Sequence, residues 1–144
     1  MIHEEIVTFE VAKLAKEKGF PQGVSRWRDF TSPSRNYYNH KGELNGDCLE
    51  MIKYICRKEE VPIELQTIAA PTQSLLQRWL REEKGITVEV FVDDDSNMPL
   101  TYNIHQYKDC NLQCVCQHHG NYYAVNDWEL CIEDALKYAL EKLV

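Results

Sequence analysis

The sequence has few glycines and no long apolar run, and both absences exclude classes of protein. Its six glycines are scattered over 144 residues, so no glycine-rich phosphate loop or dinucleotide-binding fingerprint is present. No window approaches the roughly 18 consecutive apolar residues that a membrane span requires. The first residues also lack the basic and apolar regions of a secretory signal. We therefore expect a soluble, cytoplasmic protein.

Basic residues are also scarce, because 16 Lys and Arg stand against 23 Asp and Glu, which gives a net charge of −7. Such an acidic chain is a poor general binder of nucleic acids or membrane surfaces. Its length suits a single domain over residues 1–144. Hydrophobic residues make up 44% of the chain, so a core is feasible without a metal or disulfides.

Recognisable catalytic motifs are missing as well. The five histidines form no His-Glu-x-x-His zinc motif, and no Gly-x-Ser-x-Gly nucleophile elbow occurs. A Cys and His dyad such as Cys110 with His105 stays open, because catalytic partners need not be neighbours in the chain. The acidic run Asp93 to Asp95 is interpreted as a solvated turn and not as a cation site. We therefore favour a protein that is not an enzyme and needs no cofactor.

Apolar residues at helical spacing predict the main helices. Thr8 precedes an apolar stripe that ends at Gly19, which predicts a helix over residues 8–18. The strongest stripe opens at Pro71 and ends before Gly85. Only Gly85 separates this helix from an alternating segment, so we expect Trp79 to be largely buried between the helix and that strand.

The remaining elements follow from alternation and turn residues. Two helices are expected over 47–58 and after Asp127, and strands over 36–40, 86–92, 100–105, 114–117 and 122–125. Helices, a strand meander and a final helix predict an α+β fold: a small antiparallel sheet of three to four strands with about four helices packed on it.

Six cysteines occur in a chain for which we expect a reducing compartment, so free thiols are favoured over disulfides. The candidate zinc ligands are Cys110, Cys114, Cys116 and His118. In a strand over 114–118, the last three would project to one face, but neighbouring positions on that face lie about 6.5 to 7 Å apart. We therefore expect small packing residues and no zinc.

Arginines and aromatics alternate in the segment 24–42, which carries a charge of +3 while the remainder of the chain carries −10. The partner-binding candidates are Arg26, Trp27, Arg28, Arg35, Tyr37 and Tyr38. These residues could bind another protein. Alternatively, the aromatic rings could stack on the bases of single-stranded nucleic acid while the arginines neutralise its phosphates. In a third interpretation the aromatics anchor an ordered loop to the core and the arginines pair with the protein's own carboxylates.

Three blocks carry a resemblance to a known group. The segment from Thr8 to Phe20, the segment from Ala70 to Glu82 and the terminal Glu133-Asp134-Ala135-Leu136 helix resemble a family of small uncharacterised proteins of Bacteroidales genomes and prophages. The resemblance implies a phage or mobile-element context and no catalytic residue. Together with the missing motifs it favours an accessory protein that acts through protein–protein contacts, with the nucleic-acid function as the alternative.

Overall fold

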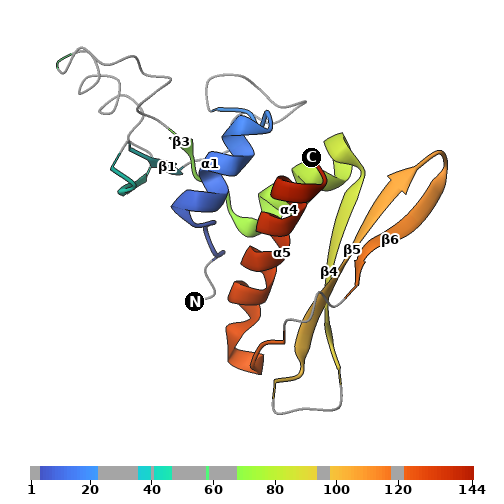
Figure 1. Cartoon of the computed structure of the whole chain (residues 1–144). Helices are drawn as coiled ribbons and strands as arrows, with labels where there is room; N and C mark the ends of the chain where they lie inside the picture. Colours follow the sequence, from blue (N-terminus) through green and yellow to red (C-terminus); the bar gives the residue numbers. More distant parts are fainter. Residues whose placement is uncertain are drawn as a thin grey trace. The chain divides into compact units, whose positions relative to one another are not determined.

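The fold is taken from a computed structural model, which describes residues 4–22, 36–39, 41–46, 58, 68–93, 98–117 and 122–144. The chain divides into two compact units, Met1–Thr72 and Gln73–Val144, and each is described by itself (Figure 1). The single domain expected over 1–144 stays a prediction. The helix expected over 47–58 lies outside the described residues except for Lys58.

Helix α1, Phe9–Glu17, forms for the reasons that the sequence indicates. The Thr8 side chain accepts a hydrogen bond from the backbone N–H of Val11, which satisfies one of the orphan donors of the first turn. At the other end Gly19 has a φ of 98°, and the N–H of Phe20 returns to the carbonyl of Ala15. The Phe20 side chain is buried beyond this glycine stop, as expected for this type of helix end.

A small antiparallel sheet accompanies α1 in the first unit. Strand β1, Asn36–Tyr38, lies between β2, Leu44–Gly46, and the two-residue β3, Ile68–Ala69. The Asn39 side chain accepts hydrogen bonds from the backbone N–H groups of Lys41 and Glu43, and Gly42 has a φ of 81°. These contacts form the turn between β1 and β2, so the turn expected at Lys41-Gly42 is confirmed. The strand expected over 36–40 begins at Asn36 as predicted and ends at Tyr38, and His40 lies outside the described residues.

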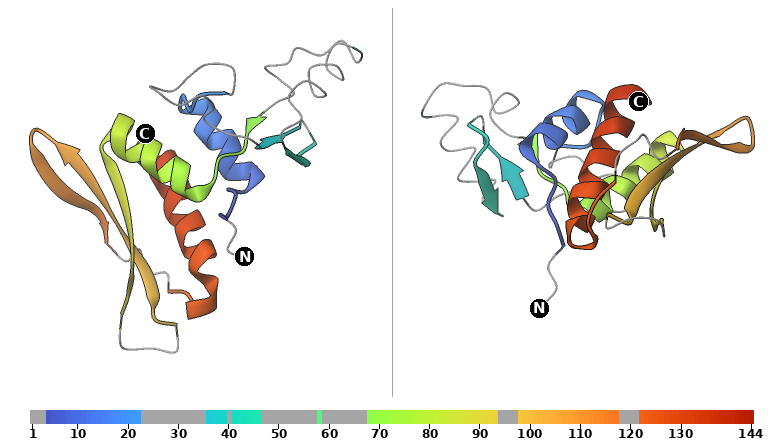
Figure 2. Two further views of the ribbon diagram at one scale, coloured as in Figure 1. Left: turned by 180° about the vertical axis from the view of Figure 1, so that it is seen from behind. Right: turned by 60° about the horizontal axis from the view of Figure 1, so that its bottom comes forward.

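The second unit contains a three-stranded antiparallel meander between two helices. Helix α4, Gln73–Lys84, precedes β4, Ile86–Val92, and the chain continues through β5, Leu100–Lys108, and β6, Asn111–Gln117. The strand order β4-β5-β6 follows the chain order. A 3₁₀ turn, Val125–Asp127, then leads into α5, Trp128–Lys142 (Figure 2).

Both helices of the second unit pack against the sheet, and α5 contacts both β4 and β5. The buried positions Leu100, Tyr102 and Ile104 alternate along β5 and therefore share the core face. Trp79 is 3% exposed, so its predicted burial is confirmed. The Gln73 side chain donates to the Glu133 carboxylate over 2.9 Å, which ties the start of α4 to α5.

A single glycine separates α4 from β4. Gly85 has a φ of 66°, and its carbonyl accepts the backbone N–H of Tyr107 over 2.7 Å. A Cβ at position 85 would lie 3.2 Å from the carbonyl oxygen of Tyr107. Two features therefore require glycine at position 85: the positive φ angle and the close approach of the β5 backbone.

The β5–β6 hairpin closes through Asp109 and Cys110, which have positive φ angles of 51° and 63°. Lys108 pairs with Asn111, so these two residues form the whole connection. Two consecutive positive φ angles are the geometry of a type I′ turn, which favours Asn-Gly or Asp-Gly. Since cysteine replaces the usual glycine, the hairpin tip was not evident in the sequence.

The α+β class is confirmed, with helices packed against an antiparallel sheet and three α-helices in the described part of the chain. Two finer expectations are wrong. The strands are divided between two sheets and do not form one. The strand expected over 122–125 is reduced to one bridge between Tyr123 and Leu100, because the 3₁₀ turn begins at Val125. Asp127 stands at the N-cap of α5, but its side chain makes no capping hydrogen bond.

Candidate functional site

The two tyrosines of the basic aromatic segment 24–42 are buried in the first unit. Four of the six predicted partner-binding residues lie outside the described residues: Arg26, Trp27, Arg28 and Arg35. Tyr37 and Tyr38, in β1, are 4% and 9% exposed. The Tyr38 hydroxyl donates to the carbonyl of Val7 over 2.6 Å, and its ring meets the Phe9 ring edge-on. These tyrosines are therefore core residues of the first unit, as in the interpretation that aromatics anchor the loop.

The cysteine-rich segment has a backbone register that the sequence did not predict. Cys114 pairs with His105, whereas Cys116 pairs with Ile104, because the register shifts between these two β5 residues. The arrangement in which Cys114, Cys116 and His118 share one face stays a prediction, because the Cys116 side chain lies outside the described part of the structure. His118 itself lies outside the described residues.

The described cysteines have different surroundings. Cys110 and Cys114 are exposed, Cys131 is buried, and none of the three is in a disulfide. No group of three or more Cys, His, Asp and Glu side chains that could hold a metal ion occurs within the described ranges. Of the acidic turn Asp93 to Asp95, only Asp93 is described. His105 faces Cys114 across the strands and not Cys110, which is in the hairpin turn.

One cluster of titratable groups fastens the segment before α5 to that helix. The Tyr123 hydroxyl donates to the Asp134 carboxylate over 2.6 Å. Burial and then the hydrogen bond to Asp134 raise the pKa of Tyr123 well above its usual value. Burial and the Asp134 charge also raise the pKa of Cys131 to about 11. A thiol with this pKa is protonated at neutral pH, so Cys131 is not an activated nucleophile and the cluster is structural.

A cavity of about 600 Å³ lies in the second unit. Its lining comes from both helices and all three strands of the unit: Gln77, Thr87, Val88, Glu89, Val90, His105, Leu112, Trp128 and Ile132. Most of these side chains are apolar, with a few polar groups among them, which is the usual composition of a binding pocket. We therefore treat this cavity as the candidate site.

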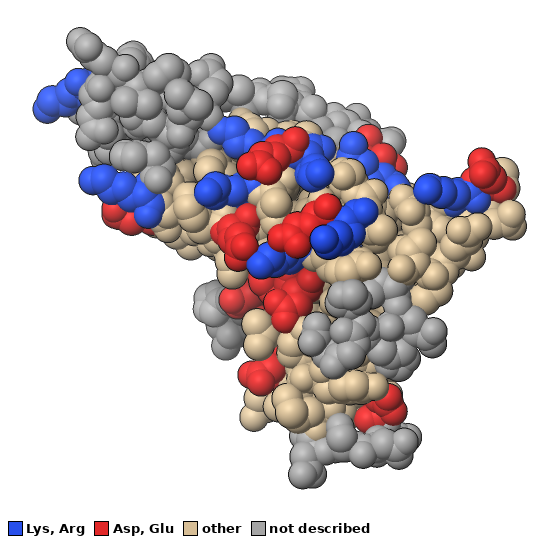
Figure 3. All heavy atoms as spheres, viewed as in Figure 1, with Lys and Arg blue, Asp and Glu red and all other residues tan. Residues whose placement is uncertain are grey.

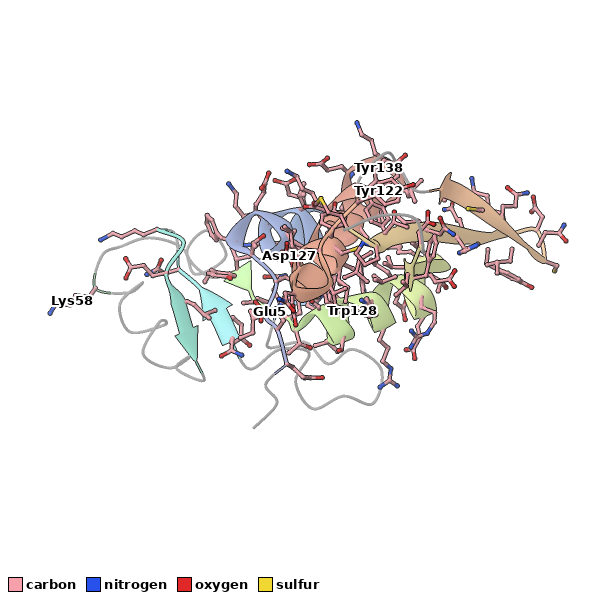
Figure 4. The ribbon with its side chains drawn as sticks, turned by 90° about the horizontal axis from the view of Figure 1, so that it is seen from below. Glu5, Lys58, Tyr122, Asp127, Trp128 and Tyr138 are labelled. Atoms are coloured by element: carbon pink, nitrogen blue, oxygen red, sulfur yellow. The ribbon has the colours of Figure 1, made fainter. Side chains whose placement is uncertain are left out.

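Trp128 is the largest side chain of the cavity and is 43% exposed. It begins α5, and Ile132 follows one turn later on the same side of the helix. Figure 4 shows Trp128 on the side of α5 toward α4, whereas Tyr138 projects from another side of the helix. Trp128 thus extends the buried stripe of α5 beyond the core, and its spacing of four from Ile132 was the signal available in the sequence.

Strand β4 borders the cavity with four consecutive residues, Thr87 to Val90. Side chains of a strand alternate between the faces, so a cavity against one face would contact every second residue through its side chain. Contact with four in succession therefore includes residues of both faces of β4. Within the described ranges, β5 is the strand that pairs with β4.

Negative charge is concentrated in one segment of the sequence of this unit. Residues 85–136 contain nine Asp and Glu but only one basic residue, Lys108, which gives −8, while the rest of the chain carries +1. At the lower end of the view in Figure 3, acidic side chains stand without basic ones; this end holds the start of α5 in Figure 1. The net negative charge of the protein thus comes entirely from the segment that contains strands β4 to β6 and Trp128.

A scan of protein-family models finds no match to the chain, and searches of curated proteins and of solved structures also find none. None of the described helices is long and apolar enough to cross a membrane.

Proposed function

We propose that the second unit is a protein-binding module and that the chain acts as an accessory protein without catalytic activity. The observation that carries the proposal is the half-exposed Trp128 in a largely apolar cavity. The resemblance to small phage and prophage proteins agrees with such a role, because it implies no catalytic residue.

Trp128 has the properties of an interface anchor. Tryptophan is enriched among the few residues that supply most of the binding energy in protein interfaces, and such anchors lie in pockets that become fully desolvated. The 43% of Trp128 that solvent still contacts would be buried by a partner seated in the cavity. Its loss should then weaken binding by about 2 kcal/mol or more, which is roughly 30-fold in affinity.

The charge distribution supports a polypeptide partner over a nucleic acid at this site. The segment 85–136 has a net charge of −8 and a single basic residue, and nucleic-acid affinity comes largely from basic side chains that replace counterions. The alternative function in single-strand binding depends on the basic segment 24–42, most of which lies outside the described residues. Absence of binding to single-stranded DNA at about 50 mM salt, where phosphate contacts are strong, would rule out that alternative.

Site-specific photo-crosslinking tests the proposal. A photo-reactive amino acid replaces Trp128 in one variant and Leu44 in the control, since Leu44 is similarly exposed at 47% but belongs to the first unit. We expect one polypeptide to crosslink at position 128 and not at 44. The same polypeptide, once purified, should bind the unmodified chain and lose about 30-fold in affinity with Trp128→Ala. Equal crosslinking at both positions, or equal affinity for the Ala variant, would refute the proposal.

A further inference from the structure

The β5–β6 hairpin exposes two large apolar side chains beside the candidate cavity. Tyr107 is 55% exposed and Leu112 is 61% exposed. They lie directly opposite each other in the pairing of the two strands, so their side chains project from the same face of the sheet. In Figures 1 and 2 the end of this hairpin projects away from α4 and α5. Tyr107 and Leu112 therefore form an exposed apolar pair, which we call the hairpin pair.

The hairpin pair is continuous with the cavity. Leu112 belongs to the cavity lining, together with Thr87 and His105. Thr87 lies opposite His105 in the sheet, and His105 shares the face of Tyr107 because one residue of β5 separates them. Three lining residues thus come from the sheet face that carries Tyr107. A group that fills the cavity contacts Leu112, and Tyr107 is the residue directly beside it.

Uncharged residue types surround the hairpin pair on this face. Cys114 lies opposite His105, so the two form a row across the sheet with Thr87. Five residues are placed together on this face and none of them is Lys, Arg, Asp or Glu: Thr87, His105, Tyr107, Leu112 and Cys114. Glu89 shares the face but lies two residues further from the hairpin pair than Thr87 does. Packing on the hairpin pair would therefore gain free energy by removing apolar surface from water and not by pairing charges.

The proposed anchor needs further surface around it. A specific protein interface buries about 800 Å² on each partner, whereas one buried aromatic side chain contributes about 150–250 Å². Trp128 is 43% exposed and supplies less than this. Most of an interface centred on the cavity must therefore come from neighbouring residues, and Leu112 is the most exposed apolar residue of the lining.

We propose that the partner's surface extends from the cavity over this face of the β5–β6 hairpin, where uncharged apolar side chains of the partner cover Tyr107 and Leu112. This inference rests on the proposed protein-binding function and specifies where the partner lies and which chemistry it presents. Ions do not screen contacts between apolar groups, so the affinity should depend little on salt. Binding should also have a negative heat-capacity change, because apolar surface is buried.

Photo-crosslinking at two neighbouring positions tests where the partner lies. The photo-reactive amino acid replaces Leu112 in one variant of the full chain and Gln113 in another. Both positions are exposed in β6, but neighbouring residues of a strand project to opposite faces, so Gln113 is the matched control. We expect the polypeptide that crosslinks at position 128 to crosslink at 112 and not at 113.

Affinity measurements with the same polypeptide, once purified, test the chemistry. Leu112→Ser should weaken binding about tenfold, because the partner no longer buries a leucine side chain. Gln113→Ser should change the affinity less than about twofold. Raising the salt from about 0.1 M to about 0.5 M should also change it less than about twofold. Circular dichroism of both variants checks that these exposed positions leave the fold intact.

The outcomes separate this inference from the proposed function. Crosslinking at 128 but not at 112, or equal crosslinking at 112 and 113, would overturn the hairpin contact and leave the protein-binding function standing. A loss of affinity of about tenfold at the higher salt would overturn the apolar chemistry. A crosslink from 112 to a second copy, or to another segment of the same chain, would identify that occupant and overturn the partner. Crosslinking at neither 128 nor 112 would overturn both proposals.

Discussion

Replacing Cys110 with glycine should stabilise the second unit. Cys110 has a φ of 63° in the two-residue turn between β5 and β6, and the preceding Asp109 has a φ of 51°. In this region the Cβ of an L-residue approaches backbone atoms too closely, whereas glycine adopts it freely. Asp is one of the residue types that tolerate a positive φ, so the strain is concentrated at Cys110.

The size of the effect is the difference of two terms. A left-handed conformation costs an L-residue about 1–2 kcal/mol, and the greater freedom of glycine in the unfolded chain offsets about 0.4–1 kcal/mol of this. The net gain expected for Cys110→Gly is therefore about 0.8 kcal/mol, with the two ranges allowing roughly 0 to 1.6 kcal/mol. For a chain of this length the melting temperature should rise by roughly 1–4 °C.

The assay is thermal unfolding followed by far-UV circular dichroism, with urea titration at constant temperature as a second measurement. Cys110→Ala is the matched control, because it removes the same thiol but keeps the Cβ. We expect the Gly variant to exceed both the parent and the Ala variant in stability. A Gly variant no more stable than the Ala variant would show that the turn carries no such strain.

Three further predictions concern the interior of the second unit. Trp79→Ala should cost about 3–5 kcal/mol, since Trp79 is 3% exposed, and an unchanged urea midpoint would contradict its place in the core. Gly85→Ala should lower the melting temperature, because its φ is 66° and the new Cβ would lie 3.2 Å from the carbonyl oxygen of Tyr107; Ser74→Ala, at an exposed helix position, is the control. Folding raises the pKa of the Cys131 thiol from 9.0 to about 11, so the folded protein favours the neutral, protonated thiol. The stability that depends on this thiol is therefore complete below about pH 9 and is lost as the pH rises through about 11. Urea titrations between about pH 8 and about pH 11 should show a smaller loss of stability for Cys131→Ala than for the parent, and an identical loss would contradict the shifted pKa.

The sequence predicted the elements whose determinants are local. Thr8 and Gly19 mark the two ends of α1, and the change from helical to alternating spacing occurs at Gly85, where α4 gives way to β4. These features depend on residues within one or two turns of each other. Capping residues and periodicity are therefore sufficient to locate them.

Long-range features could not be predicted in the same way. The backbone register of β6 depends on an irregular pairing with β5, and the bridge of Tyr123 to Leu100 joins residues 23 positions apart. The division of the strands into two sheets and the cavity of the candidate site also depend on how distant segments meet. Trp128 could be assigned to the stripe of α5, but its 43% exposure depends on tertiary packing, which the spacing does not encode.

The chain order of the second unit has a consequence for how the protein is made. Strands β4, β5 and β6 leave the ribosome in the order in which they pair, through short connections, so the meander can form early. Helix α5 is synthesised after all three strands, and it contacts both β4 and β5. Until it emerges, the apolar face that includes Tyr102 and Ile104 lacks this cover. The nascent second unit is therefore most prone to aggregation in the interval between the emergence of β5 and that of α5.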